Sequence, residues 1–394
     1  MGYGKPCVFT KEIVTLIKIY PNKNKQGRLN GDLMGSFNIQ GLFSSKKKLV
    51  ALDIGASSLK LAEVDRTSKG YTLRSYHQLL LPKGIVHEGV LEDPQALTAK
   101  IKELVRLSKV KRRNVVASLS GNAVISQKVS FATMSSDELR ELIQDEASKY
   151  LPFDNMDDVN YDFQILGKNE FNANQIDVML VAAKTDVVER FTNAIRNAGL
   201  QPVIMDVDSF ALETMYEENY DLGDDEIVAL VNIGASVTNI NVIKSRGSIL
   251  RRDFTMAGYN ITADMQSNMG LPDLEEAELK KIEGPQYDEP SDVFHEHVLT
   301  AAEPILQEIE RSIDYFRSTV GGGEISRIFL SGGSARLFGF VEALSQRLNI
   351  NTEIVNPFKN IAYNKKHFTE EEIEKMGPAA AVCVGLALRM VGDK

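Results

Sequence analysis

Two stretches far apart in the chain share one pattern of apolar and polar positions. The first is LVALDIGASSLKLAEV, Leu49–Val64, and the second is IVALVNIGASVTNINVI, Ile227–Ile243. Each has an apolar β-branched run, then Ile-Gly-Ala-Ser, then a second alternating run. This pattern predicts two β-hairpins, each with a tight turn at its glycine. Because Asp53 and Asn232 occupy the same place in the two copies, the repeat indicates two related domains.

The turns of these hairpins have the chemistry of an anion site. Glycine allows the backbone to approach a ligand closely. Small neighbouring residues leave consecutive N–H groups exposed, and such groups form an anion-binding concavity. One Ile-Gly-Ala-Ser segment alone would be interpreted as a simple tight turn. Two copies with matched polar residues favour a pair of loops that grip a polyphosphate from both sides.

A third segment, RIFLSGGSARLFGFVEAL, spans Arg327–Leu344. A strand over Arg327–Leu330 ends at Ser-Gly-Gly-Ser, and a helix is predicted to begin near Leu337, with apolar residues on one face. A glycine turn between a strand and a helix places N–H groups at a helix N-terminus, where anions are favoured. The chain has no GxxxxGK[ST] motif, which excludes a Walker-type phosphate loop.

Composition is that of an ordinary globular protein. The chain has 394 residues, 43% hydrophobic and 25% charged, enough for two or three domains. Two cysteines, Cys7 and Cys383, exclude a disulfide framework and a cysteine metal site, and they fit a reducing cytoplasm. No apolar run approaches the roughly 18 residues that span a bilayer, so a partner would have to bring the protein to a membrane.

Charge is distributed unevenly along the chain. Residues 1–50 carry nine Lys or Arg and two acidic residues, a balance of +7, whereas the net charge is −9 and the remaining residues therefore carry −16. This balance excludes a nucleic-acid protein that relies on overall positive charge. The basic leader is either a flexible tail or an artefact of an assigned start codon that lies too far upstream, in which case the real start is Met34. Lys46–Lys48 could also contact a membrane surface or an anion.

The three segments, in this order, resemble the first phosphate loop, second phosphate loop and adenosine motif of the actin-like ATPase superfamily. The closer resemblance is to the PilM family of type IV pilus assembly proteins, relatives of the cell-division protein FtsA, from about Leu49 to the C-terminus. Besides the segments already quoted, the likeness rests on Glu146–Asp154 (EASKYLPFD), Met179–Val188 (MLVAAKTDVV), Val355–Phe358 (VNPF) and Gly377–Arg389 (GPAAAVCVGLALR).

This resemblance implies a two-lobed α/β fold of duplicated ribonuclease-H-like domains, with ATP and Mg²⁺ in the cleft between them. It also implies an FtsA-type inserted subdomain in lobe I. The expected division is a basic leader at 1–48, lobe I at 49–210 with the insert at about Gly84 to Asp162, lobe II at 222–380, and a C-terminal helix and end at 381–394. Within the insert, strands are predicted at Val115–Gly121 and Ala123–Phe131, and Ser135 and Glu138 form a capping-box pattern before a helix.

Residue roles follow from the same resemblance. Asp53 would hold Mg²⁺ through water, since Mg²⁺ keeps several waters and few carboxylates. Lys60 would contact phosphate, or is a lysine on a strand surface. Backbone or hydroxyl donors to the phosphates would come from Gly55, Ala56, Ser57, Ser58, Gly234, Ala235, Ser236 and Thr238, and the adenosine would be bordered by Gly332, Gly333 and Ser334. Glu308 and Arg311 would face the purine, or form an ordinary i,i+3 surface pair.

One departure from the superfamily pattern concerns catalysis. The second phosphate loop usually carries Asp, but here it carries Asn232, which is uncharged and cannot act as a base. We therefore expect weaker Mg²⁺ binding and ATP hydrolysis that is slow or absent. Asp208, or alternatively Asp206, falls where actin relatives orient the attacking water, although aspartates before a helix are also simple N-caps.

The resemblance to the PilM family implies that the chain would be a nucleotide-binding scaffold on the cytoplasmic face of the inner membrane. It would bind the N-terminal cytoplasmic peptide of the membrane protein PilN in a groove between lobe I and its insert, and nucleotide would bias lobe closure. Membrane contact would be indirect, nucleic acid would not be bound, and self-association is possible. The alternatives are an FtsA-like polymer, a small-metabolite kinase, and a type II secretion relative. Against the FtsA-like polymer, the chain stops soon after the GLALR helix without the FtsA-type amphipathic tail.

Overall fold

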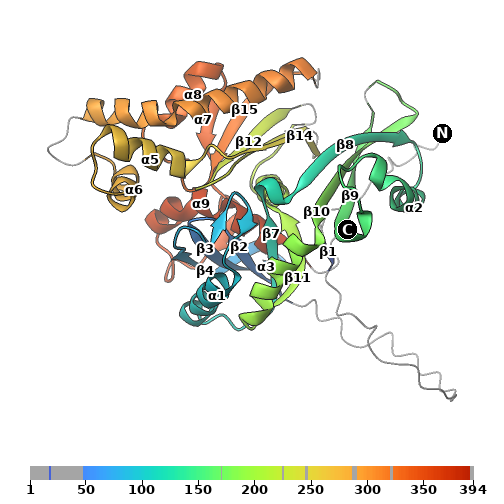
Figure 1. The fold of residues 1–394 in the computed structure, drawn as a ribbon, viewed down its shortest axis with the longest axis horizontal. Helices are drawn as coiled ribbons and strands as arrows, with labels where there is room; N and C mark the ends of the chain where they lie inside the picture. Colours follow the sequence, from blue (N-terminus) through green and yellow to red (C-terminus); the bar gives the residue numbers. More distant parts are fainter. Residues whose placement is uncertain are drawn as a thin grey trace, which may run out of the picture.

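Two large β-sheets form the framework of the molecule (Figure 1). The computed structural model describes residues 17–18, 48–169, 171–223, 226–244, 247–285, 291–319 and 323–390, so most of the basic leader lies outside the described residues. The first sheet has the order β1 (Ile17–Lys18), β11 (Gln201–Val207), β7 (Asn114–Leu119), β2 (Val50–Ile54), β3 (Ser58–Thr67), β4 (Gly70–Leu80) and β17 (Ile361–Tyr363). The second has the order β14 (Gly247–Phe254), β13 (Thr238–Lys244), β12 (Ile227–Ile233), β15 (Ile325–Ser331) and β16 (Asn351–Ile354).

The two predicted hairpins are confirmed, and their geometry is the same. In β2–β3 the Gly55 N–H donates to the Ser58 carbonyl at 3.1 Å, and Asp53 lies opposite Lys60. In β12–β13 the Gly234 N–H donates to the Val237 carbonyl at 3.0 Å, and Asn232 lies opposite Asn239. A parallel strand, β7 or β15, pairs with the first strand of each hairpin. The sequence repeat is therefore a structural repeat.

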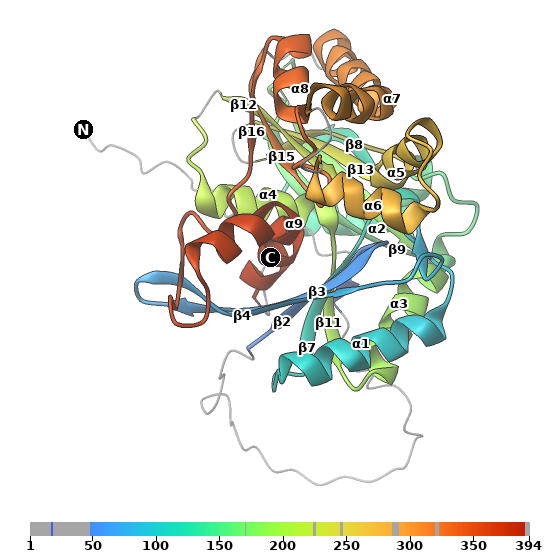
Figure 2. The same cartoon turned by 90° about the vertical axis from the view of Figure 1, so that its left-hand side faces the viewer.

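Helices cover both faces of each sheet. On the outer face of the first sheet, α1 (Pro94–Ser108) and α3 (Thr185–Asn197) share a core with β2, β3 and β7. Between the sheets lie α4 (Asp208–Asn219) and α9 (Glu370–Leu388), which pack against each other (Figure 2). The far side of the second sheet carries α5 (Gly258–Asn268), α7 (Ser291–Thr319) and α8 (Phe340–Leu348), and α6 (Leu274–Glu283) packs on α5. None of the helices in the described ranges is long and apolar enough to cross a membrane.

A small third sheet differs from the expected insert at both ends. It has the order β8 (Ile125–Ala132), β10 (Gln175–Lys184) and β9 (Val159–Lys168), and with α2 (Ser136–Glu146) it has its own core. The insert was expected at about Gly84 to Asp162, but 94–119 form α1 and β7. The strand at Val115 belongs to the first sheet because its fully buried apolar run suits a central parallel strand, paired with β2 and β11. The remaining domain limits stay predictions.

Two helix predictions can be compared directly with the structure. The Ser135–Glu138 capping box at the start of α2 is confirmed. The C-terminal helix begins earlier than the expected residue 381: it starts at Glu370, where Thr369 and Glu372 form a second capping box. Pro378 lies inside this helix, so the apolar stretch after it continues a helix that is already formed.

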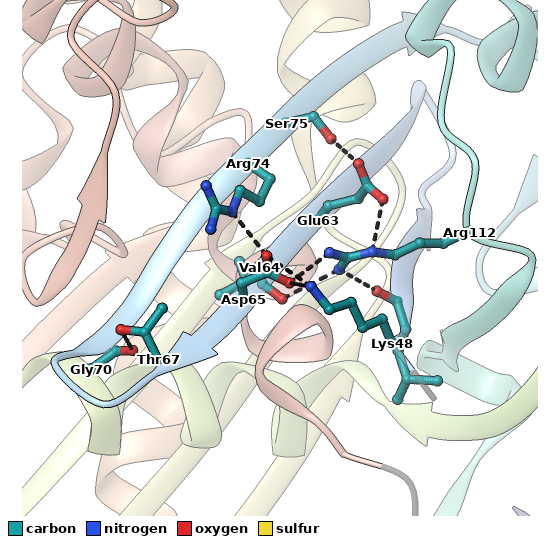
Figure 3. A network of polar contacts seen from close by, with 10 residues as sticks. Lys48, Glu63, Val64, Asp65, Thr67, Gly70, Arg74, Ser75 and Arg112 are labelled. Atoms are coloured by element: carbon teal, nitrogen blue, oxygen red, sulfur yellow. Dashed lines mark hydrogen bonds and ion pairs between the residues drawn. The ribbon is translucent and has the colours of Figure 1, made fainter. Parts of the chain in front are cut away.

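A polar cluster ties the strands together at the end of the first sheet where β2 begins. Figure 3 shows Arg112 between Glu63 and Asp65, with its Nε 3.0 Å from Glu63 and its Nη2 2.6 Å from Asp65. Arg74 and Lys48 contact the same Asp65 carboxylate at 2.9 and 3.2 Å. Partial burial alone would raise the pKa of Asp65, but the hydrogen bonds from these cations outweigh it and lower the pKa. The cluster anchors Lys48, where the leader meets β2.

The close crossing of α4 and α9 predicts a stability effect. A Cβ placed on Gly385 would lie 1.8 Å from the carbonyl oxygen of Ala211, so Gly385→Ala must push the helices apart. We expect a loss of about 1–3 kcal/mol in the free energy of unfolding, as for other overpacked cores. Gly377→Ala in the same helix is the matched control, because its Cβ would meet only Pro357, at 3.3 Å. Equal denaturation midpoints for the two variants would contradict the expectation.

Candidate functional site

The first group of predicted site residues meets at one edge of the first sheet. The parallel strands β2 and β7 bring Asp53 and Ser118 to their carboxyl ends, and Asp208 follows β11. The Nζ of Lys60 lies 3.0 Å from Oδ2 of Asp53, and both side chains are largely buried. The Ser118 hydroxyl donates to Oδ1 of Asp208 at 2.5 Å. Two carboxylates and one ammonium group are thus held together.

The charges of this group perturb one another. Burial and the nearby Asp53 carboxylate raise the pKa of Asp208 from its ordinary value near 3.8 to about 7, against the hydrogen bonds from Ser118 and Ser120. Burial alone would lower the pKa of Lys60, but the Asp53 carboxylate outweighs it and raises the pKa. The Lys60 ammonium therefore stays charged, and Asp208 gains or loses its proton near neutral pH.

The second hairpin carries a neutral version of the same arrangement. The Asn232 amide donates to Oδ1 of Asn239 at 3.1 Å and accepts a hydrogen bond from the Ser331 hydroxyl at 3.3 Å. Asn239 in turn donates to Asp253 at 2.8 Å. Where the first hairpin has an Asp–Lys ion pair, the second has an amide pair whose donors and acceptors are engaged.

The predicted glycine turn after β15 lies against the second hairpin. Gly332 has φ +93°, and a Cβ there would lie 2.3 Å from the Ile233 carbonyl oxygen, so a residue with a side chain does not fit. The Ser334 N–H donates to the same carbonyl at 3.2 Å, and the Gly332 N–H donates to the Pro378 carbonyl at 2.8 Å. The turn therefore touches both the second hairpin and α9. The helix predicted near Leu337 begins at Phe340.

The start of α5 and a buried lysine complete this side of the site, and sequence reasoning missed both. The Gly258 N–H donates to the Gly234 carbonyl at 3.0 Å, and a Cβ on Gly258 would lie 2.5 Å from the Ser334 hydroxyl oxygen. Lys281 of α6 donates to the Gly258 carbonyl at 3.1 Å and to Thr262 at 2.8 Å. Burial lowers the pKa of Lys281 although it contacts Glu278. Its local sequence, ELKK, is typical of a solvated helix surface and gives no signal of burial.

Each hairpin turn contacts an element from the other half of the molecule. The Tyr259 hydroxyl donates to the Ala56 carbonyl at 3.2 Å, which joins α5 to the first turn. The Glu88 N–H donates to the Ser236 hydroxyl at 3.2 Å, which joins the second turn to the short hairpin β5 (Val86–His87) and β6 (Val90–Leu91). Because the Tyr259 N–H also donates to the Ala235 carbonyl at 2.7 Å, the start of α5 contacts both hairpin turns.

Several predicted site residues are engaged elsewhere. The hydroxyl of Thr238 is buried and donates to the Met256 carbonyl at 2.7 Å, so it is not aimed at a ligand. Glu308 and Arg311 pair with each other on α7, and the Arg311 side chain is 66% exposed. This is the i,i+3 pair that sequence reasoning had left open, and a place beside the purine stays a prediction. Asp206 is fully buried against Arg389 at 2.6 Å, so Asp208 is the aspartate that lies beside Asp53.

The raised pKa of Asp208 predicts a pH effect on stability. Between pH 4 and 7 the folded protein retains a proton that the unfolded chain has lost, so this group's contribution to stability is full below pH 4 and falls as the pH rises to about 7. In the wild type, titration of Asp208 should lower the free energy of unfolding by an amount on the order of 2 kcal/mol between pH 5 and 8. We expect this decrease to be absent in Asp208→Asn. Asp221→Asn, at an exposed position, is the control. Parallel pH profiles of unfolding free energy for wild type and Asp208→Asn would contradict this.

Comparison with known proteins agrees with this architecture. The model of the family "Type IV pilus assembly protein PilM" matches residues 51–391. Among solved structures, a chain of a "PilM-PilN type IV pilus biogenesis complex" is 31% identical, with 87% of this chain and 98% of that chain covered and a TM-score of 0.76.

A more distant structure is similar at the level of the fold. A nucleotide-free diol dehydratase-reactivating factor is 10% identical, with 87% and 99% coverage and a TM-score of 0.50. The predicted actin-like α/β fold is confirmed, and the chain belongs to the PilM family of type IV pilus assembly proteins.

Proposed function

We propose that this protein is a nucleotide-binding scaffold of type IV pilus assembly that binds the N-terminal cytoplasmic peptide of a PilN-type membrane protein. The observation that carries the proposal is the 31% identity to the chain from a PilM–PilN complex, over 98% of that chain. The partner would hold the scaffold at the cytoplasmic face of the inner membrane. The nucleotide would lie between the two hairpin turns.

The residues at the facing turns fit ATP with Mg²⁺. Mg²⁺ prefers oxygen ligands and keeps several waters, so one or two carboxylates are enough. Asp53 and Asp208 supply them, and no cluster of three or more metal-binding side chains occurs in the portions of the chain that the structure covers. Mg²⁺ bound there would neutralise the phosphates and favour the charged form of Asp208. Lys60, beside Asp53, would meet a phosphate oxygen.

The protein groups around the nucleotide would bind it without rapid hydrolysis. Activation of water needs a base that is free to accept a proton. Asn232 cannot be that base, and its amide is engaged with Asn239 and Ser331. Asp208 would be engaged as a ligand of Mg²⁺, and it accepts a hydrogen bond from Ser118. We therefore propose that bound ATP mainly biases the relative position of the two sheets.

Nucleotide binding can be tested with one pair of variants. Wild type should bind Mg-ATP, and Asp53→Asn should bind it at least tenfold more weakly because a metal-facing carboxylate is lost. Glu308→Gln should bind like wild type, because Glu308 is paired with the exposed Arg311 on α7. Isothermal titration calorimetry measures all three proteins. Unchanged affinity in Asp53→Asn, or a larger loss in Glu308→Gln, would show that the site is misplaced.

Partner binding has its own test. A fluorescently labelled synthetic peptide with the N-terminal sequence of the PilN-type protein from the same organism should bind with micromolar or tighter Kd in the presence of Mg-ATP. A scrambled peptide of the same composition should not bind. Fluorescence anisotropy measures both. If the native and scrambled peptides behave alike, the scaffold proposal fails.

A further inference from the structure

A run of positive charge connects α1 to β7. Five of the eight residues from Arg106 to Arg113 are Lys or Arg, and the sequence has no acidic residue between Glu103 and Asp137. The run begins in the last turn of α1 and ends where β7 starts. Residues 51–394 together carry −16, so this segment has the opposite charge to the protein around it.

The run lies at one end of the first sheet. The Arg113 carbonyl accepts the Gln201 N–H at 2.7 Å, at the amino ends of β7 and β11. The Arg112 guanidinium donates to the Leu49 carbonyl at 3.0 Å, directly before β2. These three strands are parallel, and the candidate nucleotide site lies at their carboxyl ends. The basic run is therefore at the end of the sheet opposite the nucleotide site.

Two further cations belong to this end. Lys48 and Arg74 contact Asp65 together with Arg112, and their side chains are 65% and 54% exposed (Figure 3). Four more cations are exposed and have no acidic partner among the described residues: Arg106, Lys109, Lys111 and Arg113. We call these six exposed side chains the basic end. The negative end of the α1 dipole favours a cation in the last helical turn, but it does not account for cations beyond the helix.

An apolar side chain lies among these cations. Leu107, in the last turn of α1, is 49% exposed, whereas Leu104 of the same helix is 1% exposed. An exposed apolar residue flanked by cations is the combination with which proteins bind the surface of an anionic membrane. The apolar group enters the headgroup layer, and the long basic side chains reach the phosphates. An acidic protein partner would account for the cations but not for Leu107.

We propose that the basic end docks on an anionic phospholipid surface, with Leu107 inserted among the headgroups. This direct contact adds to the indirect one through the membrane partner, and in that respect it rests on the proposed function. Each cation near an anionic membrane strengthens binding about fivefold, so the contact is weak alone. A partner that holds the protein at the membrane raises the effective concentration of lipid and makes the contact stable.

The charge distribution also orients the molecule. The basic end is attracted to the anionic surface, and the acidic remainder is repelled by it. Because the candidate nucleotide site lies at the opposite end of β2, β7 and β11, it faces away from the membrane. Nucleotide therefore reaches the docked protein from the aqueous side.

Vesicle co-sedimentation of the full chain tests the docking. Wild type should bind vesicles made of equal parts of phosphatidylglycerol and phosphatidylcholine, and should not bind phosphatidylcholine alone. The triple variant Lys109→Gln/Lys111→Gln/Arg113→Gln should bind the anionic vesicles about tenfold more weakly or less, because three cations at the surface are lost. Equal binding of wild type to both kinds of vesicle would overturn the proposal.

A matched control removes the same charge elsewhere. Lys149→Gln/Lys168→Gln/Arg317→Gln changes three exposed cations that lie beside the small third sheet and on α7. Its net charge equals that of the first triple variant, and it should bind the anionic vesicles like wild type. If the two triple variants lose the same affinity, overall charge rather than the basic end is responsible, and the proposal fails.

Leu107 separates a lipid surface from an acidic protein. Leu107→Gln should weaken binding to the anionic vesicles about threefold, because less apolar surface enters the headgroup layer. Leu107→Met should bind them like wild type. Neither change should alter binding to polyglutamate, a soluble polyanion without an apolar layer. If Leu107→Gln binds the vesicles like wild type, the lipid assignment is overturned in favour of an acidic protein partner.

These assays contain neither nucleotide nor the PilN-type peptide, so their outcome is independent of the proposed function. In solution, the variant with three changes in residues 109–113 should bind the labelled peptide like wild type. A weaker peptide affinity in this variant would overturn the assignment of the basic end to lipid. If wild type itself does not bind the peptide, the proposed function fails while vesicle binding by the basic end still stands.

Discussion

The buried ion pair between Asp206 and Arg389 is the interaction on which the arrangement of the two sheets depends. Its atoms lie 2.6 Å apart, and neither side chain is more than 3% exposed. Asp206 belongs to β11 and Arg389 follows α9, so the pair fixes α9 against the first sheet. Removing one partner of such a pair leaves an uncompensated charge and costs about 3–5 kcal/mol. The Pro378 carbonyl on the same helix accepts the Gly332 N–H, which ties α9 to the second sheet. One helix thus positions both halves of the site.

The repeat is symmetric in backbone and asymmetric in charge. Both hairpins close their turns with an equivalent glycine hydrogen bond, and both place a polar pair across the strands behind the turn. The first pair is Asp53–Lys60 and the second is Asn232–Asn239. Charge is therefore concentrated on one side of the site, next to Asp208. In the proposed site a cation would meet the Asp53 and Asp208 carboxylates on this side, which agrees with the proposed binding of a metal–nucleotide complex.

Short sequence patterns predicted those parts of the site whose conformation depends on residues close together in the chain. The hairpins and the glycine turn follow from short runs of residues, because the backbone conformation there is set by the residues themselves. The limits of the insert were wrong because the pattern at Val115 predicts a strand but not its sheet, which depends on distant partners. Lys281 was missed for the same reason, since α5 buries it. Glu308 was placed by resemblance, whereas the structure pairs it with Arg311. The pairing of the leader with β11 also depends on contacts distant in sequence.

β11 and the residue after it connect the features that matter for function. Ile204 and Met205 form the edge that β1 covers, Asp206 holds α9, and Asp208 lies at the candidate nucleotide site one residue after the strand ends. Because side chains alternate along a strand, neighbouring positions serve different faces while sharing one backbone. A displacement of β11 would therefore be felt at both Asp206 and Asp208. If nucleotide binding changes the affinity for the partner peptide, thermodynamic linkage requires the peptide to change the affinity for nucleotide by the same factor.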